Sequence, residues 1–155
     1  MSRDFMRHAI ELALQNVRSA KGGPFAAIVV KDGVIVAEGT NLVTATNDPT
    51  AHAELVAIRE ACRKLGTFQL TGCELYTTCE PCPMCLGAIY WARPTSVFYA
   101  CNAADAAAAG FDDDFIYAEL RKSPSLRTIP MLQSHRDESL AIFSAWNNQK
   151  NKKPY

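Results

Sequence analysis

The spacing of apolar positions near the start of the chain predicts a helix followed by a hairpin. Residues 5–17 carry apolar side chains at helical spacing, and Gly22-Gly23-Pro24 then ends the helix. Two short apolar runs, 25–30 and 34–38, flank Asp32-Gly33, a pair typical of two-residue turns. These runs are therefore expected to be antiparallel strands.

The middle of the chain alternates helical and extended patterns. Residues 51–65 place apolar side chains on one helical face, and Thr50 is expected to cap this helix. Residues 74–78 and 97–100 are expected to be strands. The helix between them is expected to start near Pro81, because proline is tolerated in a first helical turn.

The last part of the chain is expected to contribute helices at 115–121 and 138–147 and a short fifth strand at 129–132. Strands that alternate with helices predict an α/β fold of stacked layers around a mostly mixed sheet. A length of 155 residues suits one core, so residues 1–155 are predicted to form a single domain.

Composition narrows the class of partner. Hydrophobic residues make up 48% of the chain, and 16 basic residues balance 16 acidic ones. A protein that holds a phosphate backbone usually carries a basic excess, so the balance favours a small uncharged substrate over a nucleic acid. No apolar run approaches the roughly 20 residues that span a bilayer, so no membrane partner is expected.

The cysteines give information about the cellular compartment in which the protein works. There are six, Cys62, Cys73, Cys79, Cys82, Cys85 and Cys101. An even number is compatible with disulfides in a secreted protein. The charged N-terminal residues do not resemble a signal peptide, so reduced thiols, a metal site and a cytoplasmic location are expected.

Two short motifs carry the predicted chemistry: His52-Ala53-Glu54 and, 30 residues after the histidine, a Pro-Cys-x-x-Cys motif that contains Cys82 and Cys85. A catalytic zinc takes three protein ligands and leaves one position open. His52, Cys82 and Cys85 supply such a set. The two cysteines share a face of the predicted helix, and its first turn favours thiolates.

Glu54 suits the role of an acid/base group. It lies two residues from His52, about 200° around a helix axis, which does not suit a shared coordination shell. His-x-Glu followed by Pro-Cys-x-x-Cys is typical of zinc deaminases, which remove an amino group from a ring by hydrolysis. This reaction needs a strong nucleophile, which zinc supplies by lowering the pKa of water to about 7. Glu54 would carry a proton to the ring nitrogen and then to the leaving amine.

A structural zinc site is the alternative from another class of protein. Cys79, Cys82 and Cys85 recur every three residues and, with His52, would make a closed Cys₃His site in a binding or scaffold module. Such a site leaves Glu54 unexplained, which favours the enzyme.

The chain resembles the cytidine deaminase superfamily over most of its length, and within it the bacterial guanine deaminases. Three stretches carry the resemblance: Gly22-Gly23-Pro24-Phe25 with Asn41, residues 77–94 around the cysteine motif, and residues 105–117. The resemblance implies a three-layer α/β/α fold with a five-stranded mixed sheet, one zinc ion per subunit and a homodimer. It also implies hydrolysis of guanine to xanthine and ammonia.

The resemblance further implies a substrate site. Phe25 would stack on the base and Asn41 would hydrogen-bond it, although an ordinary core phenylalanine and a turn asparagine are the alternatives. Asp113 would accept hydrogen bonds from guanine, whose N1–H and 2-amino group are adjacent donors. The sequence does not decide between Asp112, Asp113 and Asp114. The remaining substrate-site residues are Ala53, Trp91 and Tyr155, the last at the end of a tail, 148–155, that would cover the pocket of its own or a neighbouring subunit.

The second functional hypothesis is another deaminase of the same superfamily. A tRNA adenosine deaminase has the same catalytic set but usually carries Asp-x-Lys-x-Gly after the metal helix. The corresponding segment here, residues 105–110, has no lysine. A cytosine or triazine deaminase is a further alternative.

Overall fold

A four-stranded sheet of order β2-β1-β3-β4 organises the first of the two compact units into which the chain divides, Met1–Asp113 and Asp114–Tyr155. The computed structural model describes residues 4–155. The strands are β1 (Ala26–Lys31), β2 (Val34–Thr40), β3 (Cys73–Cys79) and β4 (Ser96–Cys101). β1 runs antiparallel to β2 and β3, and β3 runs parallel to β4, which confirms the predicted mixed sheet.

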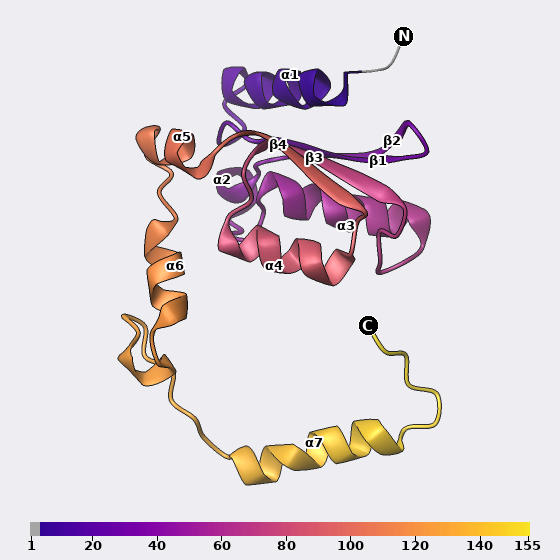
Figure 1. Cartoon of the computed structure of the whole chain (residues 1–155), viewed down its shortest axis with the longest axis vertical. Helices are drawn as coiled ribbons and strands as arrows, with labels where there is room; N and C mark the ends of the chain where they lie inside the picture. Colours follow the sequence, from indigo (N-terminus) through magenta and orange to yellow (C-terminus); the bar gives the residue numbers. More distant parts are fainter. Residues whose placement is uncertain (1–3) are drawn as a thin grey trace. The chain divides into compact units, whose positions relative to one another are not determined.

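Helices cover both faces of this sheet (Figure 1). One face carries α1 (Phe5–Arg18), and the other carries α3 (Ala53–Leu65) and α4 (Pro83–Ala92). Two short helices, α2 (Val43–Thr46) and α5 (Ala103–Ala108), belong to the same unit. Because β1 lies between these layers, residues 26–30 are all buried, which explains its unbroken apolar run.

The hairpin prediction is confirmed, and its turn explains the choice of residues. Asp32 has φ +49° and Gly33 has φ +71°, and a two-residue turn with both central residues in this region matches the twist of the flanking strands. The register shifts between Val29 and Val30, where a bulge interrupts the pairing of β1 with β2.

Two predicted helix starts were wrong by two residues. α3 is capped by His52 rather than Thr50, whose hydroxyl donates to Asp48 at 2.7 Å. α4 begins at Pro83 rather than near Pro81, and Cys82 is its N-cap. In both helices the cap is therefore a residue of the metal motif.

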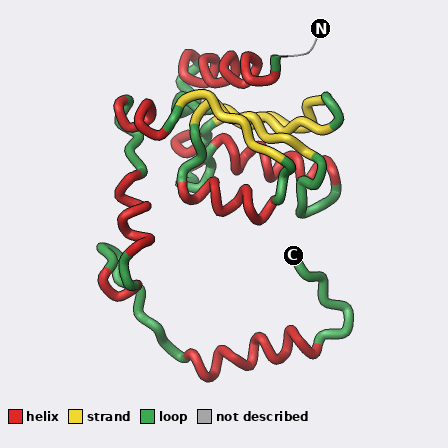
Figure 2. Tube along the Cα trace, viewed as in Figure 1, coloured by secondary structure: helices red, strands yellow, loops and turns green. Residues whose placement is uncertain are grey.

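The second unit consists of α6 (Asp114–Arg121), the 3₁₀ turn η1 (Pro124–Leu126) and α7 (Arg136–Asn148). The fifth strand predicted at 129–132 is wrong, because this segment is irregular (Figure 2). Pro130 has no N–H to donate to a strand, and the side chains of Ile129 and Leu132 are 82% and 80% exposed. β4 is consequently an edge strand of the described sheet. Within residues 4–155, no helix has the length and apolar character needed to cross a membrane.

Candidate metal centre and active site

Two helix N-termini converge at the predicted metal centre. His52 and Cys82 are the N-caps of α3 and α4, and both have extended backbone conformations. An N-cap residue lies outside the helix, so its side chain can turn across the helix end. Cys85 follows in the first turn of α4, where its backbone N–H lies 3.5 Å from Sγ of Cys82.

The spacing of the three predicted ligands fits a tetrahedral zinc site. Nδ1 of His52 lies 3.5 Å from Sγ of Cys82 and 3.6 Å from Sγ of Cys85. All three ligand atoms lie within 4.8 Å of one another. A nitrogen at about 2.0 Å and a sulfur at about 2.3 Å from one zinc ion, at a tetrahedral angle, are roughly 3.5 Å apart. The donor set and its spacing therefore match zinc.

A hydrogen bond joins the thiols of Cys82 and Cys85. The hydrogen bond from Cys85 is the largest of the effects that lower the pKa of Cys82 to about 4. The same bond, together with burial, raises the pKa of Cys85. The hydrogen bond with Cys82 raises the pKa of His52. The lowered pKa of Cys82 favours a thiolate there, whose charge a divalent cation would compensate.

Glu54 is a buried carboxyl group next to the ligands. Its side chain lies in the first turn of α3 and is only 7% exposed. The Cys85 thiol donates to Oε2 of Glu54 at 3.6 Å. Burial is the main cause that raises the pKa of Glu54 above its ordinary value. A carboxyl group with a raised pKa can both take up and release a proton near neutral pH.

Cys79 lies outside this group. Its thiol donates to the backbone oxygen of Asn102 at 3.7 Å, and burial raises its pKa to about 11. Cys79 is not one of the three residues whose ligand atoms gather within 4.8 Å of one another. This placement speaks against the closed Cys₃His site.

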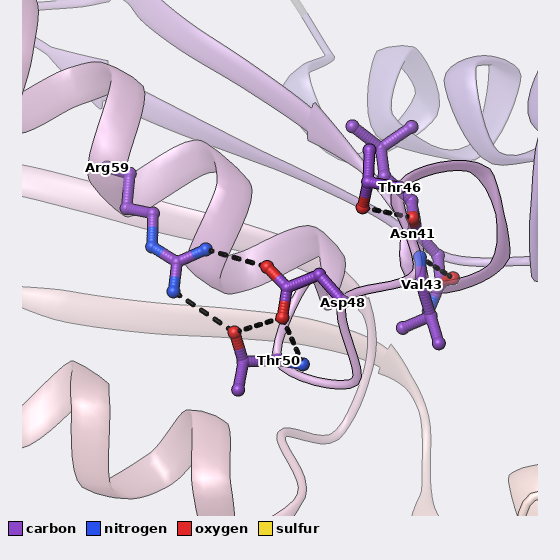
Figure 3. A network of polar contacts seen from close by, with 7 residues as sticks. Asn41, Val43, Thr46, Asp48, Thr50 and Arg59 are labelled. Atoms are coloured by element: carbon purple, nitrogen blue, oxygen red, sulfur yellow. Dashed lines mark hydrogen bonds and ion pairs between the residues drawn. The ribbon is translucent and has the colours of Figure 1, made fainter.

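A polar network shapes the loop that leads into His52 (Figure 3). Oδ1 of Asp48 accepts from the backbone N–H of Thr50 at 2.8 Å and from its hydroxyl. Arg59, in the second turn of α3, donates to the Thr50 hydroxyl at 3.2 Å and pairs with Asp48 at 3.7 Å. The backbone N–H of His52 then donates to Thr50 O at 2.8 Å. The loop is thereby tied to α3 immediately before the first metal ligand.

Gly39 on β2 lets the start of α3 approach the sheet. A Cβ atom at this position would lie 2.3 Å from Ala53 O and 2.5 Å from Ala57 N. Both are backbone atoms, so they cannot move without moving the helix. The absence of a side chain at Gly39 therefore helps to set the position of His52 and Glu54.

Two predicted base-contacting side chains, Phe25 and Asn41, flank the same backbone position. A Cβ atom on Gly23 would lie 3.4 Å from both Cδ2 of Phe25 and Cγ of Asn41. Phe25 also packs edge-on against Phe111, with ring centroids 5.0 Å apart at 86°. Oδ1 of Asn41 accepts from Val43 N at 3.2 Å. Phe111 was not recognised from the sequence as a neighbour of Phe25.

Among the three neighbouring aspartates, Asp113 is the least exposed. Its side chain is half-buried, whereas Asp112 and Asp114 are exposed. Burial is the main cause that raises the pKa of Asp113, and the charge on Cys82 adds to it.

The other three predicted substrate residues differ widely in their exposure to solvent. The Ala53 side chain is fully buried in the core. Trp91, near the end of α4, is 61% exposed. Tyr155 belongs to the second unit and is 73% exposed. A groove of about 880 Å³ lies elsewhere, between α1, β2 and α3, and none of the predicted site residues lines it.

Fold and site define a zinc-hydrolase type of centre, and comparison with known proteins specifies it further. Residues 1–101 match the family model described as the cytidine and deoxycytidylate deaminase zinc-binding region. The chain is 60% identical over 151 residues to guanine deaminase of Bacillus subtilis strain 168, covering 97% of each chain. It therefore belongs to the cytidine and deoxycytidylate deaminase family.

Two further comparisons also find deaminases. The crystal structure of guanine deaminase from Bacillus subtilis has a TM-score of 0.97 and 58% identity, covering 100% of this chain and 99% of that one. A tRNA-specific adenosine deaminase of Aquifex aeolicus is 47% identical over 93 residues, which cover 58% of this chain and 62% of the relative. The first similarity therefore extends over the whole chain, and the second over little more than half.

Proposed function

We propose that the protein is a zinc-dependent guanine deaminase that hydrolyses guanine to xanthine and ammonia. The observation that carries the proposal is a buried carboxyl group, Glu54, 3.6 Å from one of three zinc-type ligands. Similarity over 97% of the chain to a guanine deaminase supports guanine as the substrate.

The chain's own residues then have distinct roles. His52, Cys82 and Cys85 hold the zinc ion, which when bound makes water nucleophilic near neutral pH. Glu54 would carry the first proton of the attacking water to the ring nitrogen beside C2. It would then carry the second proton, from the hydroxyl group now on C2, to the departing amino group, so that ammonia leaves and the carbonyl forms. Burial suits Glu54 to this task, since it raises the pKa of the carboxyl group.

Guanine selection is assigned to the groups around Phe25, Asn41 and Asp113. The ring of Phe25 stacks on the base, and the amide of Asn41 hydrogen-bonds it. Asp113 accepts from N1–H and the 2-amino group, and its half-buried position supports it over its two exposed neighbours. The backbone of Ala53 and the ring of Trp91 complete the proposed site.

Ammonia release tests the function. The zinc-loaded protein is offered guanine, adenine, cytosine, cytidine and unmodified tRNA, with Glu54→Gln as the blank. Release from guanine alone is expected. Activity on tRNA alone would transfer the assignment to a tRNA adenosine deaminase, and no release from any substrate would reject the enzyme.

The quaternary structure proposed is a homodimer. No residue of 114–155 is buried, although this unit carries large apolar side chains such as Phe115, Ile142 and Phe143. Tyr90 and Trp91 on α4 are similarly exposed. Such surfaces usually have a protein partner. Light scattering is expected to give twice the chain mass of 17.0 kDa, and a mass of one chain would reject the dimer.

Residues 1–155 are proposed to form one functional domain. The tail, 148–155, is proposed to cover the active site of its own or of a neighbouring subunit. Its last residue, Tyr155, supplies an aromatic ring suited to covering a base. Deleting the tail is expected to weaken guanine turnover and to leave the zinc content unchanged.

The six free cysteines support the cytoplasmic location proposed for the protein, because thiols persist in a reducing compartment.

A further inference from the structure

We propose that Asn16, on α1, is a positioning residue that holds the base-binding side of the site in shape. This rests on the proposed function, because the groups it positions are Phe25 and Asn41. Sequence analysis did not single out Asn16. The signal was nevertheless present, since Asn16 continues the buried helical face of Ala9 and Ala13 as a polar residue.

The Asn16 side chain joins two segments that are far apart in sequence. It is only 3% exposed, and its amide nitrogen donates to Gly23 O at 2.9 Å and to Asn41 O at 3.0 Å. Both hydrogens of one amide group are therefore used. A buried amide with two backbone acceptors is costly to replace, because removing it leaves both carbonyl oxygens without this partner.

The two acceptors belong to the residues that arrange the base contacts. The side chains of Phe25 and Asn41 both lie against Gly23. The backbone N–H of Phe25 donates to Gly23 O at 2.9 Å, and Asn41 N donates to Phe25 O at 3.1 Å. Asn16 thus binds the oxygen of the residue between the two side chains and the oxygen of Asn41 itself.

The backbone of the glycine segment also lies very close to the backbone of Asn41. A Cβ atom on Gly22 would lie 2.1 Å from Asn41 O, so the glycine segment and Asn41 touch directly. From the opposite direction, Thr78 on β3 accepts from Ala26 N at 3.1 Å. With the backbone after Phe25 fixed to β3, the Asn16 amide fixes the backbone before it. The position of the Phe25 ring relative to Asn41 therefore depends on Asn16.

The alternative is that Asn16 only stabilises the end of α1. Its backbone oxygen accepts from Lys21 N at 3.1 Å and from the Ser19 hydroxyl at 3.3 Å, which are contacts of a helix C-terminus. A purely structural role predicts a lower melting temperature with an unchanged KM. A positioning role predicts a change in KM that exceeds any change in zinc content.

Three variants of the full-length, zinc-loaded protein separate these roles. Asn16→Ala removes both donors, and Asn16→Asp keeps the shape but places a carboxylate against two carbonyl oxygens. Ser19→Ala is the control, since it perturbs the same helix end without touching Gly23 or Asn41. Zinc content, melting temperature, kcat and KM for guanine are measured for each, together with hydrogen exchange at the amides of Phe25 and Asn41.

Asn16→Ala is expected to raise KM about tenfold, to change kcat less, and to keep its zinc. Amide exchange at Phe25 and Asn41 is expected to accelerate in Asn16→Ala and to stay as in the wild type in Ser19→Ala. Unchanged exchange in Asn16→Ala, or a lower melting temperature with wild-type KM, would overturn the positioning role. If Asn16→Asp does not fold, Asn16→Ala alone decides. Absence of guanine turnover in the wild type would instead reject the proposed function, and the exchange rates would still report whether Asn16 holds the two segments.

Discussion

The carboxylate of Glu54 lies 3.6 Å from the sulfur of Cys85, although the two residues are 31 positions apart and belong to different helices. Nδ1 of His52, only two residues from Glu54, lies 3.6 Å from the same sulfur. The N-termini of α3 and α4 thus place the acid/base candidate beside the ligand cluster rather than within it.

Glu54→Gln tests the proton carrier. The amide keeps the size of the side chain but cannot move a proton, so turnover of guanine is expected to fall by about 10²–10⁴-fold. Zinc content and melting temperature are expected to stay close to wild type. Ammonia release and elemental analysis check this, and near-normal turnover in the zinc-loaded variant would remove Glu54 from the mechanism.

Asp113→Asn tests guanine recognition. The amide can donate as well as accept, so the paired acceptor for N1–H and the 2-amino group is lost, and kcat/KM is expected to fall roughly 10- to 100-fold. Asp112→Asn and Asp114→Asn are matched controls on either side, and both are expected to remain close to wild type. A larger loss in either control would move the recognition role to that residue.

Cys79→Ser distinguishes the catalytic site from a closed structural one. Because the Cys79 thiol binds Asn102 O and lies outside the ligand group, the variant is expected to keep one zinc ion per chain. Cys82→Ser is the comparison and is expected to lose zinc. Loss of zinc in Cys79→Ser would revive the Cys₃His site.

Gly39→Ala tests the close approach of α3 to β2. The added methyl group would collide with backbone atoms of α3, and overpacking of this kind costs about 1–3 kcal/mol of unfolding free energy. Zinc affinity is expected to fall as well, because α3 must shift with His52. Urea denaturation and a zinc competition assay measure the two effects. Wild-type stability together with wild-type zinc affinity would show that the helix position does not depend on this glycine.

Asp48→Asn tests the network that precedes His52, through its dependence on pH. Hydrogen bonds from Thr50 are the main cause that lowers the pKa of Asp48 below its ordinary value of 3.8. A carboxyl group with a lowered pKa stabilises the folded state above pH 3.8, and this stabilisation disappears as the pH falls through its folded pKa. The wild type is therefore expected to exceed Asp48→Asn in unfolding free energy at pH 7, with the difference vanishing in acid. Equal stability of the two proteins at pH 7 would contradict a stabilising role of the Asp48 carboxylate.

Local sequence determined the chemistry and much of the fold. The spacing of His52, Cys82 and Cys85 predicted the ligand group that the structure brings together. Asp32-Gly33 predicted the hairpin, because the turn depends on the conformations of these two residues alone. All four strands of the sheet were likewise predicted from the sequence.

Tertiary structure decided what depends on contacts between distant segments. The run at 129–132 has an apolar pattern, but a strand also needs a hydrogen-bonding neighbour and N–H donors, and Pro130 lacks one. His52 and Cys82 are the caps of α3 and α4, and their side chains meet at 3.5 Å although they are 30 residues apart. The roles of Gly39 and Asn16 follow from backbone atoms 14 and 25 residues away, at Ala53 and Asn41. Spacing along a chain encodes which groups can share a helix or a turn, whereas only packing decides which distant backbone lies against them.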